Sequence, residues 1–284
     1  MIPSAFDYVA PTTVDDAIRA LAEAGEDGKV LAGGQSLLPV LRMRLAAPSK
    51  LVDLGRIPEL RGVRDEGDKL VIGSMTTHYD VQRDHLVREH ALLLAMATDT
   101  VADPQVRHRG TFGGSLAHAD PAGDLLAPAL ALDAELVVSG MDGRRIIPAA
   151  EFFVDYFTTA MRQGEILVEV RVPKYTGWSA HYEKFNRVAQ AWSMVGVAAA
   201  IRTDGGTIAE ARVGLTNMAS TPVRARAVEE ALVGQPATRE VINAAAAHAA
   251  DGTSPASDAN ADAEFRQHLA RVLTGRAVAA AAGA

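Results

Sequence analysis

The sequence predicts an α+β protein that contains two domains. Up to about residue 175, short apolar strand patterns alternate with helical stretches. After the turn-forming run Pro173-Lys174-Tyr175-Thr176-Gly177, longer strand patterns come first and alanine-rich helices follow. We therefore predict a first domain over 1–175, with two α/β subdomains at about 1–55 and 56–175. A smaller α+β domain with an antiparallel sheet and helices is predicted over 178–284.

The first subdomain is predicted from periodicity and capping residues. Apolar residues recur at helical spacing after Thr13, a capping residue, and Gly25 ends that helix. A second helix carries the stripe Leu37, Leu38, Leu41 and Leu45, with Pro39 in its first turn. We expect strands at 6–9, 29–32 and 51–54.

The remaining elements follow from the same patterns. We expect strands at 70–73, 135–139 and 165–172, and helices around 78–86, 89–97 and 121–132. The segment Asp103–Ser115 is rich in Gly, Pro and charge and is predicted to be a loop. In the second domain, strands are expected at 181–187, 193–203 and 207–216, and helices near 224–233, 238–250 and 259–278. Asp204-Gly205-Gly206 joins the last two strands as a hairpin.

Composition excludes several classes of function. The 28 Lys and Arg are scattered and are outnumbered by 35 Asp and Glu, which argues against nucleic acid as a partner. The chain has no cysteine, so iron–sulfur clusters must be held by another chain. The eight histidines show no metal-ligand spacing, and roles at the surface or in loops are expected for all but His118. We predict no metal site and no catalytic residue on this chain.

The sequence also indicates where the protein works. No stretch approaches the ~20 uncharged apolar residues that a bilayer span needs. The N-terminus lacks the basic and apolar regions of a signal peptide. We expect a cytoplasmic protein whose association with a membrane is at most peripheral.

Two glycine pairs are the main candidates for a binding site. Gly33-Gly34 stands where a strand turns into a helix, so the backbone can approach a phosphate and point N–H groups at it. An isolated pair of this kind more often only relieves crowding in a tight turn. A second pair, Gly113-Gly114, stands about eighty residues later, and the two loops together are suited to clamp a dinucleotide pyrophosphate. Neither loop carries a Rossmann or P-loop signature.

At these loops the chain resembles the FAD-binding subunits of molybdenum hydroxylases of the carbon monoxide dehydrogenase and xanthine oxidase family. The resemblance extends over nearly the whole chain. It is carried by Phe6-Asp7-Tyr8, Pro11-Thr12-Thr13, 32–39, 102–107, 111–124, 164–167, Val172-Pro173, 182–185 and 195–198. It implies a first domain of the PCMH-type, vanillyl-alcohol oxidase-like FAD-binding fold, and a second domain like the C-terminal domain of the carbon monoxide dehydrogenase flavoprotein.

The resemblance also implies which residues hold the FAD pyrophosphate. They are Ala32, Gly33, Gly34, Gln35 and Ser36 in the first loop, and Thr111, Phe112, Gly113, Gly114 and Ser115 in the second. Relatives often carry Asn at the position of Ser115, which leaves its contact open, although a hydroxyl can still donate to phosphate. Neither Gln35 nor Ser36 offers the histidine or cysteine that covalent flavoproteins use, so we expect FAD to be dissociable.

Five more residues match cofactor-binding positions of the family. Asp124 is expected to accept hydrogen bonds from a ribose or adenine-side group, although an acidic residue near a helix start also favours the helix dipole. Val101 and Leu167 are expected to contact the flavin, and Lys184 to donate a hydrogen bond near its ring. From the residues alone, Val101 and Leu167 equally fit the core, and Lys184 equally fits a solvated surface position. Trp192 is expected either to stack on the isoalloxazine or to pack at a domain junction.

Three functions remain open from the sequence. The first is electron transfer: FAD takes electrons from the [2Fe–2S] clusters of a small partner and passes them to quinone or another acceptor, while a large molybdenum-cofactor partner oxidises the substrate. We expect a dimer of such heterotrimers, of carbon monoxide dehydrogenase type or of a related aldehyde, xanthine or heteroaromatic dehydrogenase. The second is a self-contained flavin oxidase, for which no catalytic base is evident. The third is a non-enzymatic nucleotide-binding or scaffold protein.

Overall fold

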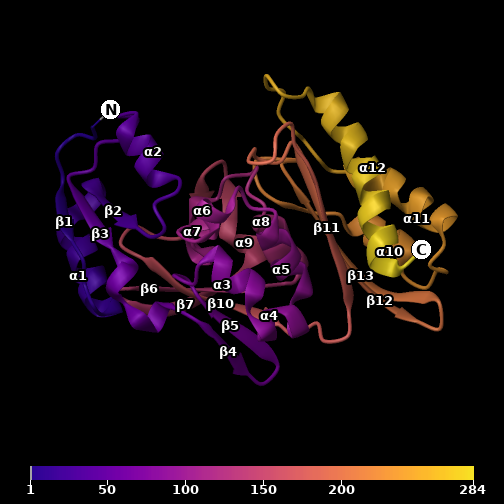
Figure 1. Ribbon diagram of the computed structural model, residues 1–284, viewed down its shortest axis with the longest axis horizontal. Helices are drawn as coiled ribbons and strands as arrows, with labels where there is room; N and C mark the ends of the chain where they lie inside the picture. Colours follow the sequence, from indigo (N-terminus) through magenta and orange to yellow (C-terminus); the bar gives the residue numbers. More distant parts are fainter. Residues whose placement is uncertain (1) are drawn as a thin grey trace.

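The computed structural model describes residues 2–284 and confirms the α+β class. Three parts follow one another along the long axis of the molecule, from the N-terminal strands to the C-terminal helices (Figure 1). The first part has a parallel three-stranded sheet in the order β1-β3-β2. Its elements are β1 (Asp7–Val9), α1 (Val14–Ala24), β2 (Gly28–Leu31), α2 (Leu37–Arg42) and β3 (Lys50–Asp53). The Thr13 hydroxyl caps α1 by accepting from the Asp16 amide, as predicted.

The second part has a five-stranded sheet in the order β4-β5-β10-β6-β7, in which every neighbouring pair is antiparallel. Its strands are β4 (Val63–Glu66), β5 (Lys69–Gly73), β6 (Glu135–Gly140), β7 (Gly143–Pro148) and β10 (Ile166–Pro173), with a separate hairpin of β8 (Phe153–Asp155) and β9 (Thr158–Thr159). Its helices are α3 (His78–Arg83), α4 (His85–His90), α5 (Leu92–Asp99), α6 (Pro104–Arg107), α7 (Phe112–His118), α8 (Leu126–Ala131) and α9 (Ala149–Phe152).

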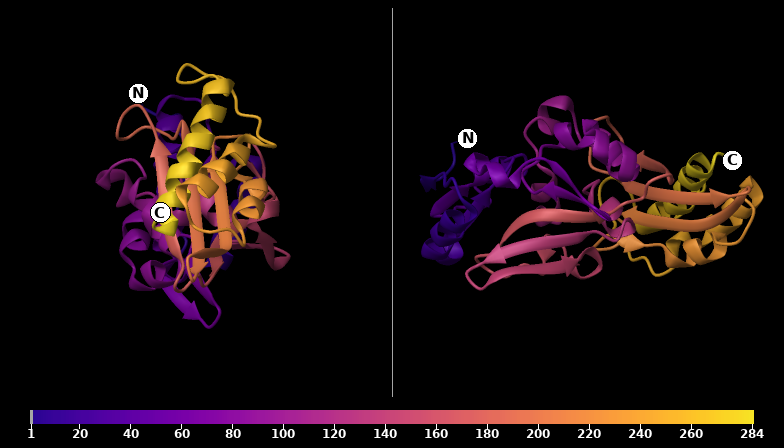
Figure 2. Two further views of the ribbon diagram at one scale, coloured as in Figure 1. Left: turned by 90° about the vertical axis from the view of Figure 1, so that its right-hand side faces the viewer. Right: turned by 90° about the horizontal axis from the view of Figure 1, so that it is seen from below.

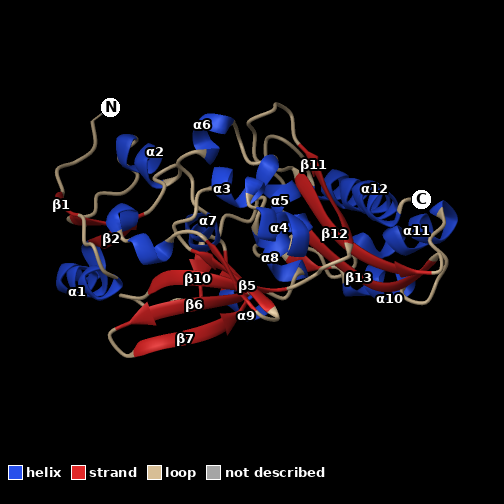
Figure 3. Ribbon diagram, turned by 60° about the horizontal axis from the view of Figure 1, so that its bottom comes forward, coloured by secondary structure: helices blue, strands red, loops and turns tan. Residues whose placement is uncertain are grey.

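The third part has an antiparallel sheet in the order β11-β12-β13-β14 with three helices. The strands are β11 (Ser179–Phe185), β12 (Val195–Asp204), β13 (Thr207–Thr216) and β14 (Val223–Arg224), and the helices are α10 (Arg226–Leu232), α11 (Arg239–Ala246) and α12 (Ala263–Ala282). Helix α12 lies along the outer side of β11 and β12 (Figures 1 and 2). The sheet also contacts α5 and α8 of the second part (Figure 3).

Close packing joins the third part to the second. A Cβ atom at Gly214 on β13 would lie 2.5 Å from the Ala127 carbonyl oxygen, so α8 contacts the bare backbone of that strand. Buried Tyr182, Ala198 and Ala200 belong to the same core cluster as the helices and sheet of the second part. Because this core is continuous, we expect the two parts to hold one relative orientation.

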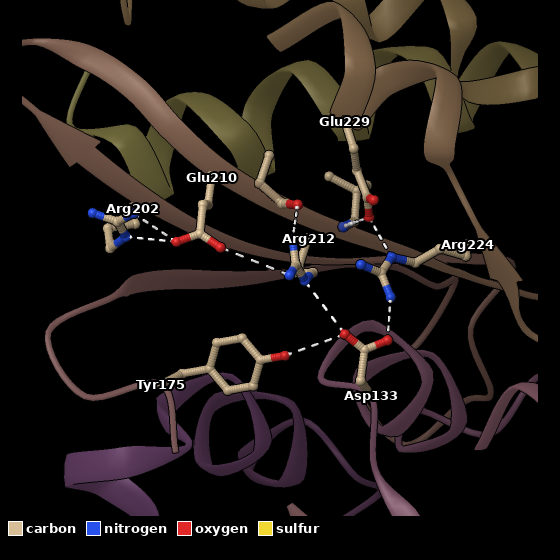
Figure 4. A network of polar contacts seen from close by, with 9 residues as sticks. Asp133, Tyr175, Arg202, Glu210, Arg212, Arg224 and Glu229 are labelled. Atoms are coloured by element: carbon tan, nitrogen blue, oxygen red, sulfur yellow. Dashed lines mark hydrogen bonds and ion pairs between the residues drawn. The ribbon is translucent and has the colours of Figure 1, made fainter. Parts of the chain in front are cut away.

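An ionic network also spans this junction (Figure 4). Asp133, which follows α8, pairs with Arg224 at 2.9 Å and with Arg212 at 3.4 Å. Arg224 in turn contacts Glu229 of α10, whose carboxylate accepts from the Val213 amide at 2.7 Å. The Arg224 and Glu229 side chains are nearly buried, so removal of either one would leave the other charge without its partner.

Some predicted elements differ from the structure. The segment Asp103–Ser115 is not a loop throughout, because Asp103 and Thr111 cap the short helices α6 and α7 with their side chains. The helix expected from about residue 121 begins only at Leu126. Strands β4, β7, β8, β9 and β14 and helix α9 were not predicted. The exact domain boundaries at 175 and 178 stay predictions.

Candidate functional site

The two glycine loops, far apart in sequence, touch in the structure. Gly33 lies against the backbone of Arg109 and Gly110, and a Cβ atom at Gly33 would be only 2.7 Å from the Gly110 Cα atom. A Cβ atom at Gly114 would lie 3.4 Å from the Ala32 Cβ atom. No side chain fits at Gly33 without moving one loop off the other, so this glycine is required by a close approach of two backbones.

The first loop leaves a run of backbone donors free. Gly34 has φ +75°, a conformation that favours glycine, and its carbonyl accepts from the Leu38 amide at 2.9 Å. The Gln35 side chain donates to the Gly33 carbonyl at 3.1 Å. The amides of residues 33–37 donate to no acceptor within residues 2–284. Consecutive free N–H groups around a left-handed residue form an anion-binding concavity.

The second loop uses most of its amides to hold itself in place. Phe112 and Gly113 donate at 2.9 Å to the carbonyls of Thr76 and Ser74, and Gly114 donates at 3.2 Å to the Thr111 hydroxyl. A Cβ atom at Gly113 would lie 2.5 Å from that of Ser74, which explains the glycine. The sequence predicted that the two loops clamp a pyrophosphate from both sides. In the structure the first loop offers free amides, and the second contributes backbone packed closely against the first and the partly buried Ser115.

A buried histidine supports the second loop. The His78 amide donates to the Gly110 carbonyl at 2.9 Å, and a Cβ atom at Gly110 would lie 2.7 Å from the imidazole. Burial, together with the positive charge of Arg107, lowers the pKa of His78 to about 4, so the ring is neutral at pH 7. The expectation of a surface or loop role for this histidine was wrong. His78 and Val81 stand three residues apart on α3 and are both buried. This helical spacing indicates that His78 faces the core.

Asp124 lies at the centre of a buried polar cluster that joins the second and third parts. Its carboxylate accepts from the Lys184 ammonium at 2.7 Å, the Tyr182 hydroxyl at 2.9 Å and the Ser193 hydroxyl at 2.6 Å. Burial raises the pKa of Asp124, while Lys184 and the two hydroxyls act in the opposite direction. Because a carboxylate offers about four acceptor positions, it keeps room for one further donor. The sequence did not predict Tyr182 or Ser193.

The other predicted site residues lie around these two groups. Lys184 also donates to the Thr100 carbonyl at 3.1 Å, beside half-buried Val101. Leu167 is buried on β10, next to Val168, whose carbonyl accepts from the Ser74 amide. Trp192 precedes Ser193 on a loop and is 58% exposed. Phe112 is fully buried, and its side chain belongs to the core cluster of the second part.

Helix α6 connects the glycine loops with the Asp124 cluster. The Arg107 guanidinium donates to the Val101 carbonyl at 2.9 Å, and the Gly110 amide donates to the Val106 carbonyl at 2.6 Å. At the other end of α6, Asp103 accepts from the Gln190 side chain at 2.8 Å. The site therefore combines backbone donors at one end with a buried charged pair and an exposed indole at the other.

Comparison with known proteins identifies the family. Residues 4–175 match the family described as the FAD binding domain in molybdopterin dehydrogenase. The chain belongs to this family. Residues 180–281 match the CO dehydrogenase flavoprotein C-terminal domain. The membership confirms the resemblance that the sequence motifs indicated.

Relatives in this FAD-binding family align with the chain over nearly its full length. The carbon monoxide dehydrogenase medium chain of Hydrogenophaga pseudoflava is 42% identical and covers 99% of this chain and 98% of its own length. The medium chain of Afipia carboxidovorans is 38% identical, covering 98% and 97%. A structure of carbon monoxide dehydrogenase from Hydrogenophaga pseudoflava superposes with a TM-score of 0.96 at 44% identity, covering 99% of this chain and 98% of that chain.

The residues of the site fit the FAD that the family binds. A pyrophosphate needs several donors in one concavity, and the amides of 33–37 provide them. Its close approach to the backbone requires positions without a side chain, and Gly33 and Gly34 supply these. Asp124 retains acceptor capacity, and Trp192 offers a flat apolar surface.

Proposed function

We propose that this chain is the FAD-binding electron-transfer subunit of a molybdenum hydroxylase of carbon monoxide dehydrogenase type. It receives electrons from the [2Fe–2S] clusters of a small partner and passes them to quinone or another external acceptor. The observation that carries the proposal is the run of free amides at 33–37, pressed against the second glycine loop. That arrangement can bind the pyrophosphate of a dinucleotide, and within residues 2–284 these amides donate to no acceptor of the chain itself.

The side chains and backbone of the chain bind and orient the cofactor. The amides of 33–37 and the Ser115 hydroxyl would hold the pyrophosphate, and Gly33 keeps the two loops at contact distance. Asp124 would accept one hydrogen bond from FAD in addition to the three from the protein. Val101, Leu167 and Lys184 would contact the flavin, and the Trp192 indole would stack on it. Bound FAD supplies the conversion between single-electron and two-electron transfer.

The substrate is oxidised on the large partner in this proposal. The chain has no cysteine, so it cannot ligate an iron–sulfur relay, and none of its site residues is placed as a base beside a substrate. Both relatives named above are carbon monoxide dehydrogenase medium chains, at 42% and 38% identity, which supports a complex of that type. The acceptor, the dimer of heterotrimers and the cytoplasmic location remain parts of the proposal. Within residues 2–284 no helix is long and apolar enough to cross a bilayer.

Flavin release tests the binding mode. The chain is purified in its complex, its visible spectrum is recorded, and the protein is then precipitated with acid. We expect one FAD per chain, all of it in the supernatant, because neither loop carries a histidine or cysteine that could bond to the flavin. Flavin that stays with the pellet would contradict non-covalent binding, and a complex that contains no flavin in either the supernatant or the pellet would refute the proposed function.

A further inference from the structure

Arg266 is a charged residue on the buried side of α12. It is 2% exposed, and most of the buried residues that follow it on the helix are aliphatic. Its guanidinium donates to the Met194 carbonyl and, at 2.8 Å, to the Asp258 carboxylate, while its Nε atom has no partner within residues 2–284. Burying a cation is costly, and an apolar side chain of similar size often stabilises a fold as well or better. Packing alone therefore does not account for this arginine.

The buried part of the arrangement is the contact with Met194. The Asp258 side chain is 47% exposed, so the ion pair at that end is screened by solvent. Met194 is buried and directly precedes β12. Its amide donates to the Phe185 carbonyl at 2.8 Å, which closes the base of the β11–β12 loop, residues 186–193. Arg266 thus holds the end of this loop from a distant position in the sequence.

The end of the β11–β12 loop carries two residues of the cofactor site. Ser193, immediately before Met194, donates to the Asp124 carboxylate at 2.6 Å. Trp192 comes one residue earlier, is 58% exposed and belongs to none of the three apolar core clusters of residues 2–284. Since core packing does not fix the indole, its position depends on the backbone that follows it. Arg266 holds that backbone at the carbonyl of residue 194.

We propose that Arg266 is a positioning residue for the cofactor: it holds the loop end so that Ser193 reaches Asp124 and the Trp192 indole stacks on the flavin. The inference rests on the proposed function, because it assumes that FAD occupies the site. The hydrogen bonds of Arg266 run to Met194 and Asp258 and to none of the predicted cofactor residues. Arg266 therefore acts on the flavin through the backbone of the loop.

Removal of Arg266 should displace this backbone. The Met194 carbonyl would stay buried without a donor, which is unfavourable, so the peptides around 193 and 194 would turn until that carbonyl reaches water. The Asn217 side chain cannot replace the arginine, because it already donates to the preceding carbonyl, that of Ser193, at 2.8 Å. We expect the indole to leave the flavin while the glycine loops keep their places.

Flavin fluorescence in the assembled complex tests the inference. An indole stacked on the isoalloxazine quenches flavin fluorescence, so Trp192→Leu gives the signal of an uncovered flavin. Arg266→Met removes the donors and keeps a long side chain. We expect it to raise the fluorescence per bound FAD towards that of Trp192→Leu, and to add nothing to it in the double variant. Its Kd for FAD should rise about three- to tenfold, which corresponds to one lost aromatic contact.

Two controls separate positioning from stability. Arg224→Met removes another nearly buried, ion-paired arginine of the third part, whose hydrogen bonds run to Leu130, Asp133 and Glu229 rather than to the β11–β12 loop. It should lower the unfolding midpoint and leave fluorescence and Kd unchanged. Asp258→Asn removes the anion and keeps the Met194 contact, so it should also leave both unchanged. If Arg266 served only to tie Asp258 to α12, Asp258→Asn would behave like Arg266→Met.

The outcomes decide between the inference and the proposed function. A folded Arg266→Met complex with quenched flavin and an unaltered Kd overturns the inference, and so does Trp192→Leu without a rise in fluorescence. Controls that reproduce the Arg266→Met signal overturn it as well. If Arg266→Met does not assemble, Arg266→Lys replaces it, because lysine keeps the charge and loses the planar fork; a smaller rise is expected, and no rise overturns the inference. Absence of FAD from the unchanged complex would refute the proposed function instead.

Discussion

Replacement of Gly33 by alanine tests the contact between the two glycine loops. The added methyl carbon would lie 2.7 Å from the Gly110 Cα atom and closer still to the Arg109 carbonyl oxygen. Carbon atoms of neighbouring residues normally stay about 3.5–4.0 Å apart, so the loops must separate by about 1 Å. Neither side can yield by rotating a side chain, because both groups are backbone.

That separation should cost FAD affinity rather than the fold. A shift of this size spoils at least two of the hydrogen bonds to the pyrophosphate, each contributing about 1.5–3 kcal/mol because the acceptor is charged. The sum, about 3–6 kcal/mol, corresponds to a hundredfold or greater rise in Kd for FAD. Gly275→Ala is the matched control, since its new methyl would meet the end of the Asn243 side chain at 3.0 Å and the Ala246 Cβ atom at an ordinary contact distance of 3.7 Å.

The assay measures FAD content after desalting and Kd by fluorescence quenching, in the complex and in the isolated chain. The circular dichroism spectrum and the unfolding midpoint report whether each variant is folded. We expect Gly33→Ala to be folded and depleted of flavin, and Gly275→Ala to match the unchanged protein. A folded Gly33→Ala protein with full flavin content and normal Kd would refute the two-loop site.

Two other predictions concern buried charge. Asp124→Asn leaves the Lys184 ammonium buried without its anion, so the unfolding free energy should fall by about 3–5 kcal/mol in urea titrations; a change below about 1 kcal/mol would contradict the buried pair. His78 has a folded pKa of about 4, below the ordinary histidine value of 6.5, so its contribution to stability is complete above pH 6.5 and is lost as the pH falls towards 4. That loss is about 3 kcal/mol and should disappear in His78→Gln; identical pH profiles for both proteins would contradict it.

The sequence predicted the strands and helices whose buried residues form a recognisable apolar pattern. Strands β5, β6 and β10 carry mostly buried residues, and α1 combines a capping threonine with a buried stripe, so periodicity and caps sufficed. Strands β4 and β7 were missed because they lie at the edges of the sheet and most of their residues are exposed, so neither shows an apolar strand pattern. Pairing with a neighbouring strand, rather than local pattern, makes them strands.

The candidate site was predicted in part. Two glycine pairs indicated a two-loop site, and the structure brings the loops into contact. The sequence could not show that the Phe112 and Gly113 amides are already bonded, since their acceptors, Thr76 and Ser74, belong to a distant segment. The same holds for Asp124, whose three protein donors come from β11 and the loop after it. Such partners are set by tertiary packing and leave no local signal.

Turnover before and after assembly tests the central claim most directly. The FAD-loaded chain is assayed with carbon monoxide, aldehydes and heteroaromatic substrates and a dye acceptor, first alone and then with the molybdenum-cofactor and [2Fe–2S] chains. We predict that dithionite reduces the flavin of the lone chain, that the lone chain oxidises none of these substrates, and that turnover appears only when all three chains are present. Substantial turnover by the lone chain would contradict the electron-transfer assignment and favour a self-contained flavin oxidase.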